Sequence, residues 1–327
     1  MAIVGIKSLR FAAEDVAITK RFFSDFGLPL VESDPDRALF ALAEGSTVEV
    51  LPMGHASLPS GEIKGPGAHE IIWGVDSREA LMDLVNDLRR DHTVTEGSDG
   101  AFHFIPFFGI PMALAYWQRK KVVYSPDPSN APDRVVRLNT HRKWRNRAIP
   151  KVLNHVVHAI PDYEAGTAFM RERLGFRLSD VQDTFGIYLR ADGSNNHHSI
   201  LLLNANAKLP DCDGSARFHH ANFGVEDLDE LMIGVNNMER CGWEMSDIGL
   251  GRHRVDSGLF YYLPFPGGGE IEYGADQDYI DDSWVPRLFT VPLFGYAHFT
   301  AKVPPFIKEP PEWTFKYLTS ECAPRRG

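Results

Sequence analysis

The sequence predicts an α+β fold in which four related modules form two curled sheets. Residues 6–30 (IKSLRFAAEDVAITKRFFSDFGLPL) parallel residues 153–178 (LNHVVHAIPDYEAGTAFMRERLGFRL), and each copy has the order strand, helix, strand. The chain has 327 residues and is 43% hydrophobic, so it can bury a large core and is long enough for two domains of ordinary size. Internal repetition and length together therefore indicate one pair of modules in each half.

In each half, the first module has an aspartate at the end of its strand and a glycine at the end of its helix. The strand closes at Asp15 in one copy and at Asp162 in the other. The amphipathic helix after this strand ends at Gly27 or at Gly175, and glycine is favoured at helix C-termini because it accepts the left-handed conformation.

Each half also contains a second module. Residues 69–76 (HEIIWGVD) align with residues 220–227 (HANFGVED), and a helix is predicted after each, at 78–89 and 229–240. In every module short strands come after the helix, separated by turns of Gly, Pro and Asp. Such strands are expected at 38–42, 48–52, 187–190 and 199–203.

These patterns predict four segments along the chain. Residues 1–117 form an N-terminal domain, and residues 118–151, rich in Arg, Lys and Pro, form a basic surface linker. Residues 152–282 form the second domain. Residues 283–327 contain seven prolines and several aromatic residues, so we expect this tail to pack on the domain, over its pocket or on a neighbouring subunit of a homo-oligomer.

Composition excludes several classes of function. A net charge of −10 and a pI near 5.7 argue against nucleic-acid binding, which requires a basic surface. No stretch approaches 18 apolar residues, so membrane insertion and export are not predicted. The cysteines are odd in number and widely spaced (Cys212, Cys241 and Cys322), which is typical of unpaired thiols in a reducing cytoplasm.

Two histidines and a glutamate are the candidate metal ligands. His155 and His220 occupy the same position of the repeated strand, each seven residues before an aspartate. Because successive side chains of a strand point to opposite faces, His155 and His158 reach one metal together only across a bulge. Glu270 and Glu272 lie on the same face, so alternation leaves both open. Two imidazoles and one carboxylate are the ligand set of non-haem Fe(II) oxygenases.

The first half lacks an equivalent set. Aligning the two halves places Ser8, His69 and Leu114 at the positions of the second half's candidate ligands. Of these three residues only His69 is of a type that commonly binds a metal. The sequence therefore predicts that the first half is a metal-free structural partner and that the chemistry belongs to the second half.

Four local patterns carry a family resemblance. They are residues 154–162 (NHVVHAIPD) with Phe169 and residues 174–176 (LGF), residues 196–200 (NHHSI), residues 218–221 (FHHA), and residues 251–274, in which GRH, FYY, PG and EIEYG occur in order. On these patterns the chain resembles the vicinal oxygen chelate superfamily and, within it, the two-domain type I extradiol ring-cleaving dioxygenases. The resemblance covers roughly residues 1–287 and implies four βαβββ modules in two curled, mixed sheets.

The resemblance also implies the ligand set. The metal histidines would be His155 and His220, the latter being the second of its pair. The ligand glutamate of the family lies ten residues after a tyrosine, which selects Glu272 by its distance from Tyr262. The implied metal is Fe(II), and Mn(II) accepts the same ligands.

Three further residues receive roles from the resemblance. All three would be catalytic residues: His198 the acid/base, and His253, beside the metal site, and Tyr262 the contacts that orient the substrate by hydrogen bonds. Two departures from the family signature stand nearby: Phe265 replaces a small polar or acidic residue, and Tyr261 replaces an aliphatic residue or Phe. These two departures leave the substrate subgroup open.

The implied activity is O2-dependent extradiol cleavage of a small aromatic diol, as in the degradation of aromatic compounds. The alternatives within the same fold are a glyoxalase-type isomerase and a 4-hydroxyphenylpyruvate-type dioxygenase, and the alternative of another class is a non-catalytic metal-binding protein. An isomerase draws on both halves or both subunits, which Ser8 and Leu114 argue against. The pair His197 and His198 favours extradiol cleavage over the keto-acid enzyme.

Overall fold

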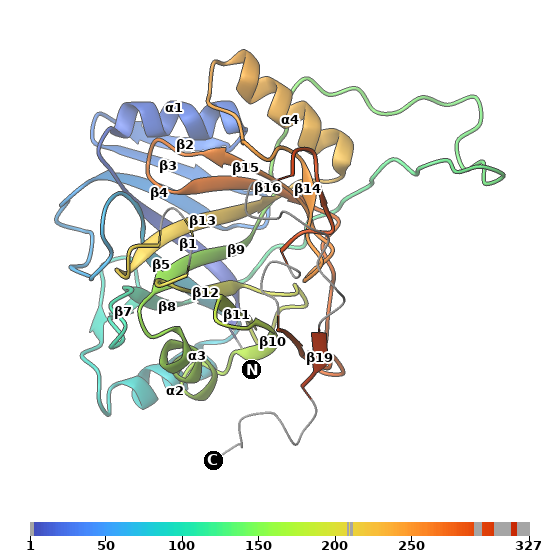
Figure 1. Cartoon of the computed structure of the whole chain (residues 1–327). Coiled ribbons are helices and arrows are strands. Elements are labelled where there is room, and N and C mark those ends of the chain that lie inside the picture. Colours follow the sequence, from blue (N-terminus) through green and yellow to red (C-terminus); the bar gives the residue numbers. More distant parts are fainter. Residues whose placement is uncertain (1–2, 208, 210–211, 291–295, 304–314, 319–327) are drawn as a thin grey trace.

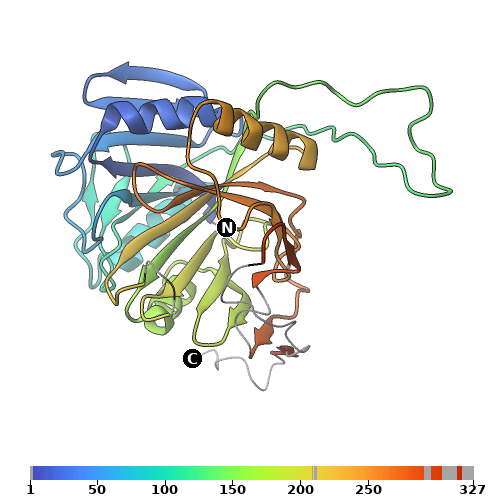
Figure 2. The same ribbon diagram turned by 45° about the horizontal axis from the view of Figure 1, so that its top comes forward.

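Two sheets, one from each half of the chain, make up the body of the molecule (Figure 1, Figure 2). The structure is a computed structural model, and it describes residues 3–207, 209, 212–290, 296–303 and 315–318. The first sheet has eight strands in the order β2-β3-β4-β1-β5-β8-β7-β6. Its strands are β1 (Ile3–Ala13), β2 (Leu30–Asp34), β3 (Arg37–Ala41), β4 (Thr47–Pro52), β5 (Gly67–Val75), β6 (Thr95–Glu96), β7 (Phe102–Phe104) and β8 (Met112–Tyr116).

The second sheet repeats this order and adds strands at its edges. Its eleven strands run β18-β14-β15-β16-β13-β9-β12-β11-β10-β17-β19. They are β9 (Val152–Ile160), β10 (Arg177–Gln182), β11 (Gly186–Arg190), β12 (Ile200–Asn204), β13 (Arg217–Gly224), β14 (Gly251–Arg252), β15 (Leu259–Pro264), β16 (Glu270–Ala275), β17 (Arg287–Phe289), β18 (Phe299–Thr300) and β19 (Phe315–Tyr317). The predicted α+β class with two sheets of paired modules is confirmed.

Each module contains one helix: α1 (Val16–Phe26), α2 (Arg78–Leu88), α3 (Tyr163–Glu172) and α4 (Leu228–Arg240). Each begins after a side chain that accepts a hydrogen bond from a backbone N–H of the first turn, namely Asp15, Ser77, Asp162 and Asp227. α1 ends at Gly27, whose φ of 106° requires a residue without a Cβ.

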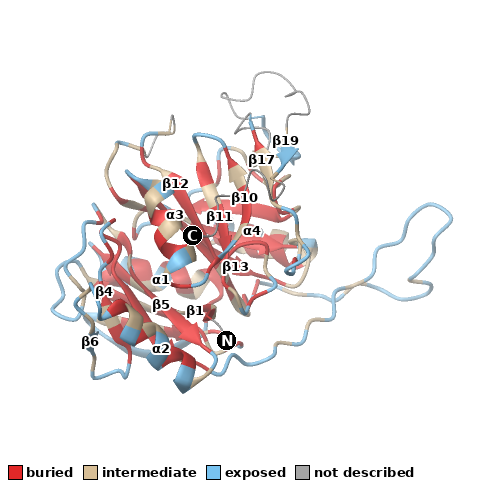
Figure 3. Cartoon of the chain, turned by 90° about the horizontal axis from the view of Figure 1, so that it is seen from below, coloured by how far each residue is buried: buried red, intermediate tan, exposed pale blue. Residues whose placement is uncertain are grey.

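The halves pack through helices that come from different modules (Figure 1). α1 lies beside α4, where Trp243 Nε1 donates to Asp25, and α2 lies beside α3, where Arg173 pairs with Asp87 and Asp91. The buried residues lie between these layers and along both sheets (Figure 3). The second half is therefore held on the first over a continuous apolar core.

The strand registers correct one part of the alignment between the halves. In the second sheet Val157 of β9 pairs with His220 of β13, and in the first sheet Arg10 pairs with Glu70. The bulges of the two pairs fall at the same steps, so Glu70, and not His69, is the counterpart of His220.

The counterpart of Glu272 shifts in the same way. Asn222 pairs with Glu272, whereas its counterpart Ile72 pairs with Ala113, so Leu114 was wrong by one residue.

The alignment of His69 slipped because it used the aspartate that ends each segment as its anchor. In the structure the helix cap of the first half is Ser77, one residue beyond that aspartate. The alignment of Leu114 slipped because it matched residues 106–109 with residues 264–267, whereas the strand pairs make residue 105 the counterpart of residue 264.

Residues 118–151 form an extended arm that projects from the body and returns to it (Figure 1, Figure 2). Its base is tied to the start of α4 by Arg142 with Asp229 and by Arg145 with Glu226. We keep the division into residues 1–117, 118–151, 152–282 and 283–327 as a proposal. The first part of the tail, β17, pairs with β10 and so lies in the second sheet.

Candidate metal centre and its cavity

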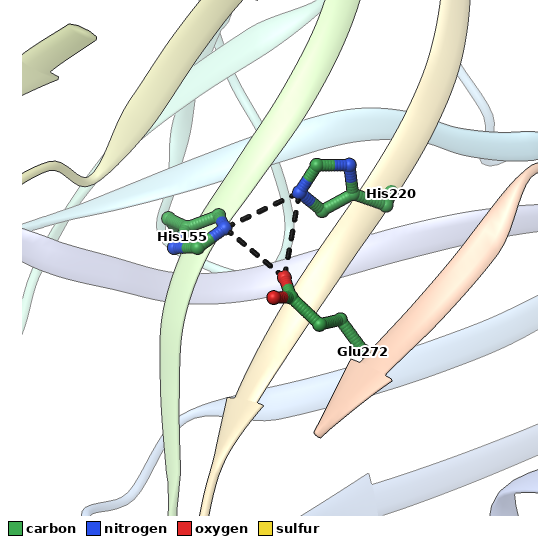
Figure 4. Close-up of side chains that lie close together, drawn as sticks. All are labelled: His155, His220 and Glu272. Atoms are coloured by element: carbon green, nitrogen blue, oxygen red, sulfur yellow. Dashed lines mark hydrogen bonds and ion pairs between the residues drawn. The ribbon is translucent and has the colours of Figure 1, made fainter. Parts of the chain in front are cut away.

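Three neighbouring strands bring the candidate ligands together. His155 lies on β9, His220 on β13 and Glu272 on β16, and these strands are adjacent in the sheet. The two Nε2 atoms are 3.3 Å apart, and Glu272 Oε2 lies 3.4 Å from His155 Nε2 and 3.5 Å from His220 Nε2 (Figure 4). Three ligand atoms therefore converge on one point.

The donor set fits a divalent metal ion. All three side chains are buried, and Glu272 Oε2 has no hydrogen-bond partner. A buried carboxylate oxygen without a donor is unfavourable unless a cation lies next to it. The three ligands come from one side, which leaves the opposite side of an ion open to other molecules.

Charge and burial set the protonation of these ligands. Burial lowers the pKa of His220 well below its usual value, so the imidazole is neutral and its Nε2 is free to bind a metal. Burial alone would raise the pKa of Glu272, but the neighbouring imidazoles of His155, His253 and His220 hold that pKa below its usual range. The site is thus ready to bind a cation without first releasing protons.

The structure places the other predicted residues around the ligands. The ring of His198 stacks on that of His155 with centroids 4.0 Å apart. His253 Nε2 lies 3.8 Å from Glu272 Oε1 and 3.2 Å from the hydroxyl of Tyr262. All six predicted site residues are therefore neighbours, and their roles remain predictions.

His253 and Tyr262 form a hydrogen-bonded pair beside the ligands. His253 Nδ1 donates its proton to the backbone carbonyl of Tyr296, and its Nε2 lies within hydrogen-bond distance of the Tyr262 hydroxyl. Burial and the charge of Glu272 raise the pKa of Tyr262 well above its usual value, and the hydroxyl keeps its proton. A hydrogen-bond donor therefore stands beside the metal position at neutral pH.

A cavity of about 300 Å³ opens in front of the ligands. It is lined by His155, Val157, Phe185, Tyr188, His198, Leu201, Leu203, Leu209, His219, His220, Glu244, Met245, Ser246, Asp247, Ile248, His253, Val255, Tyr262, Pro264, Glu270 and Tyr296. This volume suits a small molecule, and its lining includes every predicted site residue except Glu272, which lies behind the others.

Of the histidines that the sequence assigned no catalytic role, His219 lines the cavity, whereas His158 and His197 lie outside its lining. His158 points away from His155 and donates from Nε2 to the carbonyl of Ala68 in the first half, as strand alternation predicts. His197 pairs with Asp180 behind His198. The sequence analysis missed Asp180, which no local motif marks, because its strand reaches the site only through the sheet order β9-β12-β11-β10.

Asp256 and Tyr296 were also missed. Asp256 Oδ2 is buried without a hydrogen-bond partner and lies 3.9 Å from His198 Nδ1. Its position three residues after His253 was the available signal. Tyr296 belongs to the C-terminal segment and lines the cavity. The composition predicted that this segment packs on the domain, over its pocket or on a neighbouring subunit.

Comparison with known proteins shows what this part of the chain resembles. Residues 152–262 match the Glyoxalase/Bleomycin resistance protein/Dioxygenase superfamily. Metapyrocatechase 2 of Cupriavidus necator is 34% identical over 139 residues, 42% of this chain and 41% of that protein. An iron-dependent extradiol dioxygenase of Rhodococcus jostii strain RHA1 is 34% identical over 158 residues, 44% of this chain and 50% of that protein. The matches span half or less of these relatives.

Solved structures share the fold over almost the whole chain. The Mn(II)-bound glyoxalase from Novosphingobium aromaticivorans has a TM-score of 0.69 at 19% identity and covers 93% of this chain and 94% of its own. BphC, a halotolerant catechol dioxygenase, has the same TM-score and identity and covers 96% and 99%. Both halves therefore have the fold that these proteins share.

Proposed function

We propose that this protein is an Fe(II)-dependent extradiol dioxygenase that opens the ring of a catecholic compound with O2, in the degradation of aromatic compounds. The observation that carries the proposal is the one-sided set of His155, His220 and Glu272 at the floor of a cavity of about 300 Å³. Relatives named metapyrocatechase and iron-dependent extradiol dioxygenase support it. Mn(II) is the second candidate metal, since a structural neighbour binds it.

The residues around the metal position supply binding and proton transfer. When bound, Fe(II) would draw the protons from the chelating catechol oxygens and pass electron density to O2. Burial lowers the pKa of His198 well below its usual value, so its imidazole is neutral and can take a proton. Tyr262 keeps its proton and can orient an oxygen of the substrate by donating a hydrogen bond.

A glyoxalase-type isomerase is the second candidate, because one structural neighbour is a glyoxalase. The distribution of possible metal ligands between the two halves argues against an isomerase. The three ligands here come from one half, and the corresponding positions of the first half hold Ser8, Glu70 and Ala113, of which Glu70 is already paired with Arg10.

Oxygen uptake separates these functions. The protein is loaded anaerobically with Fe(II), mixed with catechol, a biphenyl-diol, a carboxylated catechol and a fused-ring catechol, and then exposed to air. Extradiol cleavage consumes one O2 per ring and gives a yellow product, whereas an isomerase or a metal-storage protein consumes none. Absence of uptake with every catechol in an Fe(II)-saturated sample would contradict the proposal.

We further propose a cytoplasmic homo-oligomer. The three cysteines of the sequence are odd in number and widely spaced, which supports a reducing compartment. The arm carries ten Lys or Arg against two Asp in a chain whose net charge is −10, and Trp144 on it is 90% exposed. A basic arm with exposed apolar side chains suits the acidic body of a second copy. No helix of the described residues is long and apolar enough to cross a membrane.

Light scattering tests the oligomer. Trp144→Ser should shift the protein towards the monomer if the arm joins subunits, while Val31→Ser, at an exposed position of β2, should not. Truncation at Asp282 is a poor test because it removes β17 from the sheet. A full-length protein that is monomeric at micromolar concentration would overturn the proposal.

A further inference from the structure

The cavity has one apolar wall. β9 and β12, which are parallel neighbours, contribute Val157, Leu201 and Leu203 to its lining, and Val255 joins them from the loop after β14. All four are buried and belong to one apolar cluster. A substituent on a ring bound in front of the ligands would therefore meet hydrocarbon on this side.

Carboxylates line the cavity elsewhere. Glu270 lies on β16 on the same face as Glu272 and two residues before it. Glu244 and Asp247 contribute from the segment that joins α4 to β14, and both are exposed. The cavity thus combines a negative charge near the metal position with negative charges at its edge.

We propose that the site selects uncharged catechols with an apolar substituent and discriminates against catechols that carry a carboxylate. The inference rests on the proposed function and refines its substrate. A carboxylate in this cavity would lose its hydration against an apolar wall and would lie near three carboxylates of the protein. A hydrocarbon substituent has no strong hydration to lose there, and burial of its apolar surface stabilises binding.

Three substrates of equal chain length test the charge alone. 4-Propylcatechol, dopamine and 3-(3,4-dihydroxyphenyl)propanoate end the same two-carbon arm in methyl, ammonium and carboxylate. We expect kcat/KM to be highest for propylcatechol and lowest for the propanoate, with a difference of about tenfold or more. Anaerobic titration of the Fe(II) protein with the same three compounds should give dissociation constants in the same order.

A double variant isolates the exposed carboxylates. Glu244→Gln with Asp247→Asn should raise kcat/KM for the propanoate relative to propylcatechol, and Glu239→Gln with Asp276→Asn is the matched control outside the cavity lining. A propanoate that is bound and cleaved as well as propylcatechol would overturn the substrate class and leave extradiol cleavage standing. Binding without any ring opening would instead overturn the proposed function, while the order of affinities still tests the substrate class.

A different observation concerns the proton of His198. Behind it, Asp180 is fully buried and accepts from Arg287 and, at 2.8 Å, from His197 Nε2. His197 Nδ1 in turn lies 3.2 Å from His198 Nδ1. The three side chains form a buried chain of hydrogen bonds that ends at His198.

This chain fixes which nitrogen of His198 carries the proton. Asp180 only accepts, so the proton of His197 is on Nε2, and Arg287 already balances the charge of Asp180. On a ring that carries one proton, the Nδ1 of His197 is then an acceptor, and His198 donates from its own Nδ1. Asp256 Oδ2, at 3.9 Å, is a second acceptor facing the same nitrogen.

We infer that His197 is a positioning residue that holds His198 with its Nε2 lone pair unprotonated and available to the cavity. A base that accepts a proton from the substrate needs such a lone pair. In the opposite tautomer Nε2 would carry a proton and could not accept another. Asp180 and Arg287 support this role from behind by holding His197.

Two variants at His197 separate positioning from packing. His197→Asn keeps an acceptor oxygen for His198 Nδ1, and His197→Leu fills similar space without one. We expect kcat to fall about 10- to 100-fold in His197→Leu and much less in His197→Asn, while Fe(II) content and anaerobic catechol affinity stay unchanged in both. Equal losses of kcat in the two variants would show that only packing matters and would overturn the inference.

Nitrogen-15 NMR of histidine-labelled, metal-free protein reads the tautomer directly. His198 should show its proton on Nδ1 in the wild type, and a proton on Nε2 would overturn the inference. His197, His198 and Asp256 also have the spacing of a metal site. Metal analysis therefore completes the test: a second tightly bound equivalent per chain that is lost in His197→Leu would mean that these nitrogens bind metal and do not hold a proton.

Discussion

Eight strands of the second sheet repeat the order of the first, and the bulges beside the ligand positions recur, yet the two sheets hold different chemistry at the same place. Where the second sheet has its three candidate ligands, the first has Ser8, Glu70 and Ala113. Only Glu70 is ionisable, and it is fully buried. The fold therefore provides the location, and the side chains at a few register positions decide what it holds.

The first sheet fills that location with a cation of its own. Arg10, the counterpart of Val157, donates to Glu70 at 2.9 Å, to Glu49 at 2.9 Å and to Asp99 at 2.7 Å. A guanidinium on the chain thus balances the carboxylates in one half. In the second half the smaller Val157 leaves this space open, so a bound metal ion can balance the charge of the carboxylate instead.

The largest expected effect breaks the comparison at the ligands. His155→Ala or Glu272→Ala should abolish Fe(II) retention and ring opening, because two of three donors cannot hold the ion in place. His69→Ala, in the first half, should leave both nearly intact. Metal content by mass spectrometry after desalting, with activity on the same samples, checks this. Full occupancy in His155→Ala would contradict the assignment.

His198→Phe removes the acid/base and keeps a ring against His155. Fe(II) and catechol affinity should persist, while O2 activation or ring opening slows by roughly 10² to 10⁴ fold, the usual share of one general acid/base. Anaerobic titration followed by rapid mixing with O2 measures both. His103→Phe, which removes a histidine from the ion pairs of the first sheet, is the control expected to turn over normally. An unchanged ring-opening rate in His198→Phe would remove it from the mechanism.

A smaller effect comes from making the second half resemble the first. Val157→Arg would introduce the guanidinium that the first sheet carries at this register position, close to Glu270 and Glu272. We expect Fe(II) affinity to fall about 10- to 100-fold, since the added charge competes for the same carboxylates. Val157→Met is the uncharged control, and isothermal titration with Fe(II) under argon compares the three proteins. Equal affinity in Val157→Arg and Val157→Met would show that charge balance does not distinguish the halves.

Much of this arrangement could be predicted from sequence, because repeats record the fold directly. The helix caps Asp15, Asp162 and Asp227 and the strand positions of the candidate ligands follow from local patterns. The register of the first sheet did not follow from them, since the helix cap Ser77 lies one residue later than its repeat partner suggests and moves the counterpart of His220 from His69 to Glu70. A shift of one residue changes the face of a strand and so the chemistry inferred.

The surroundings of the site were harder to predict. Asp180 and Arg287 are 107 residues apart, and they meet His197 only because β10, β17 and the segment before β12 come together in the folded sheet. Arg10 was not noticed because its partners come from β4, β5 and the turn before β7. Contacts of this kind depend on sheet order, which no local spacing encodes.

The smallest expected effect concerns the contact between the halves. His158 is fully buried, and its Nε2 donates to the carbonyl of Ala68 in β5. Burial lowers the pKa of His158 to about 4 from an ordinary value of 6.5. At pH values between these two pKa values, His158 binds a proton in the unfolded chain but not in the folded protein. The free energy of unfolding therefore rises with pH across this range.

The contribution of His158 is complete above an unfolded pKa of 6.5 and is lost as pH falls towards 4. A shift of this size corresponds to about 3 kcal/mol between the two limits. His158→Gln can keep the donor to Ala68 without a titrating group, so its unfolding free energy should depend less on pH in this range. Urea unfolding of both proteins at several pH values gives the two slopes. Because the other buried histidines are common to both proteins, equal slopes would show that the junction of the two halves is not pH-sensitive through His158.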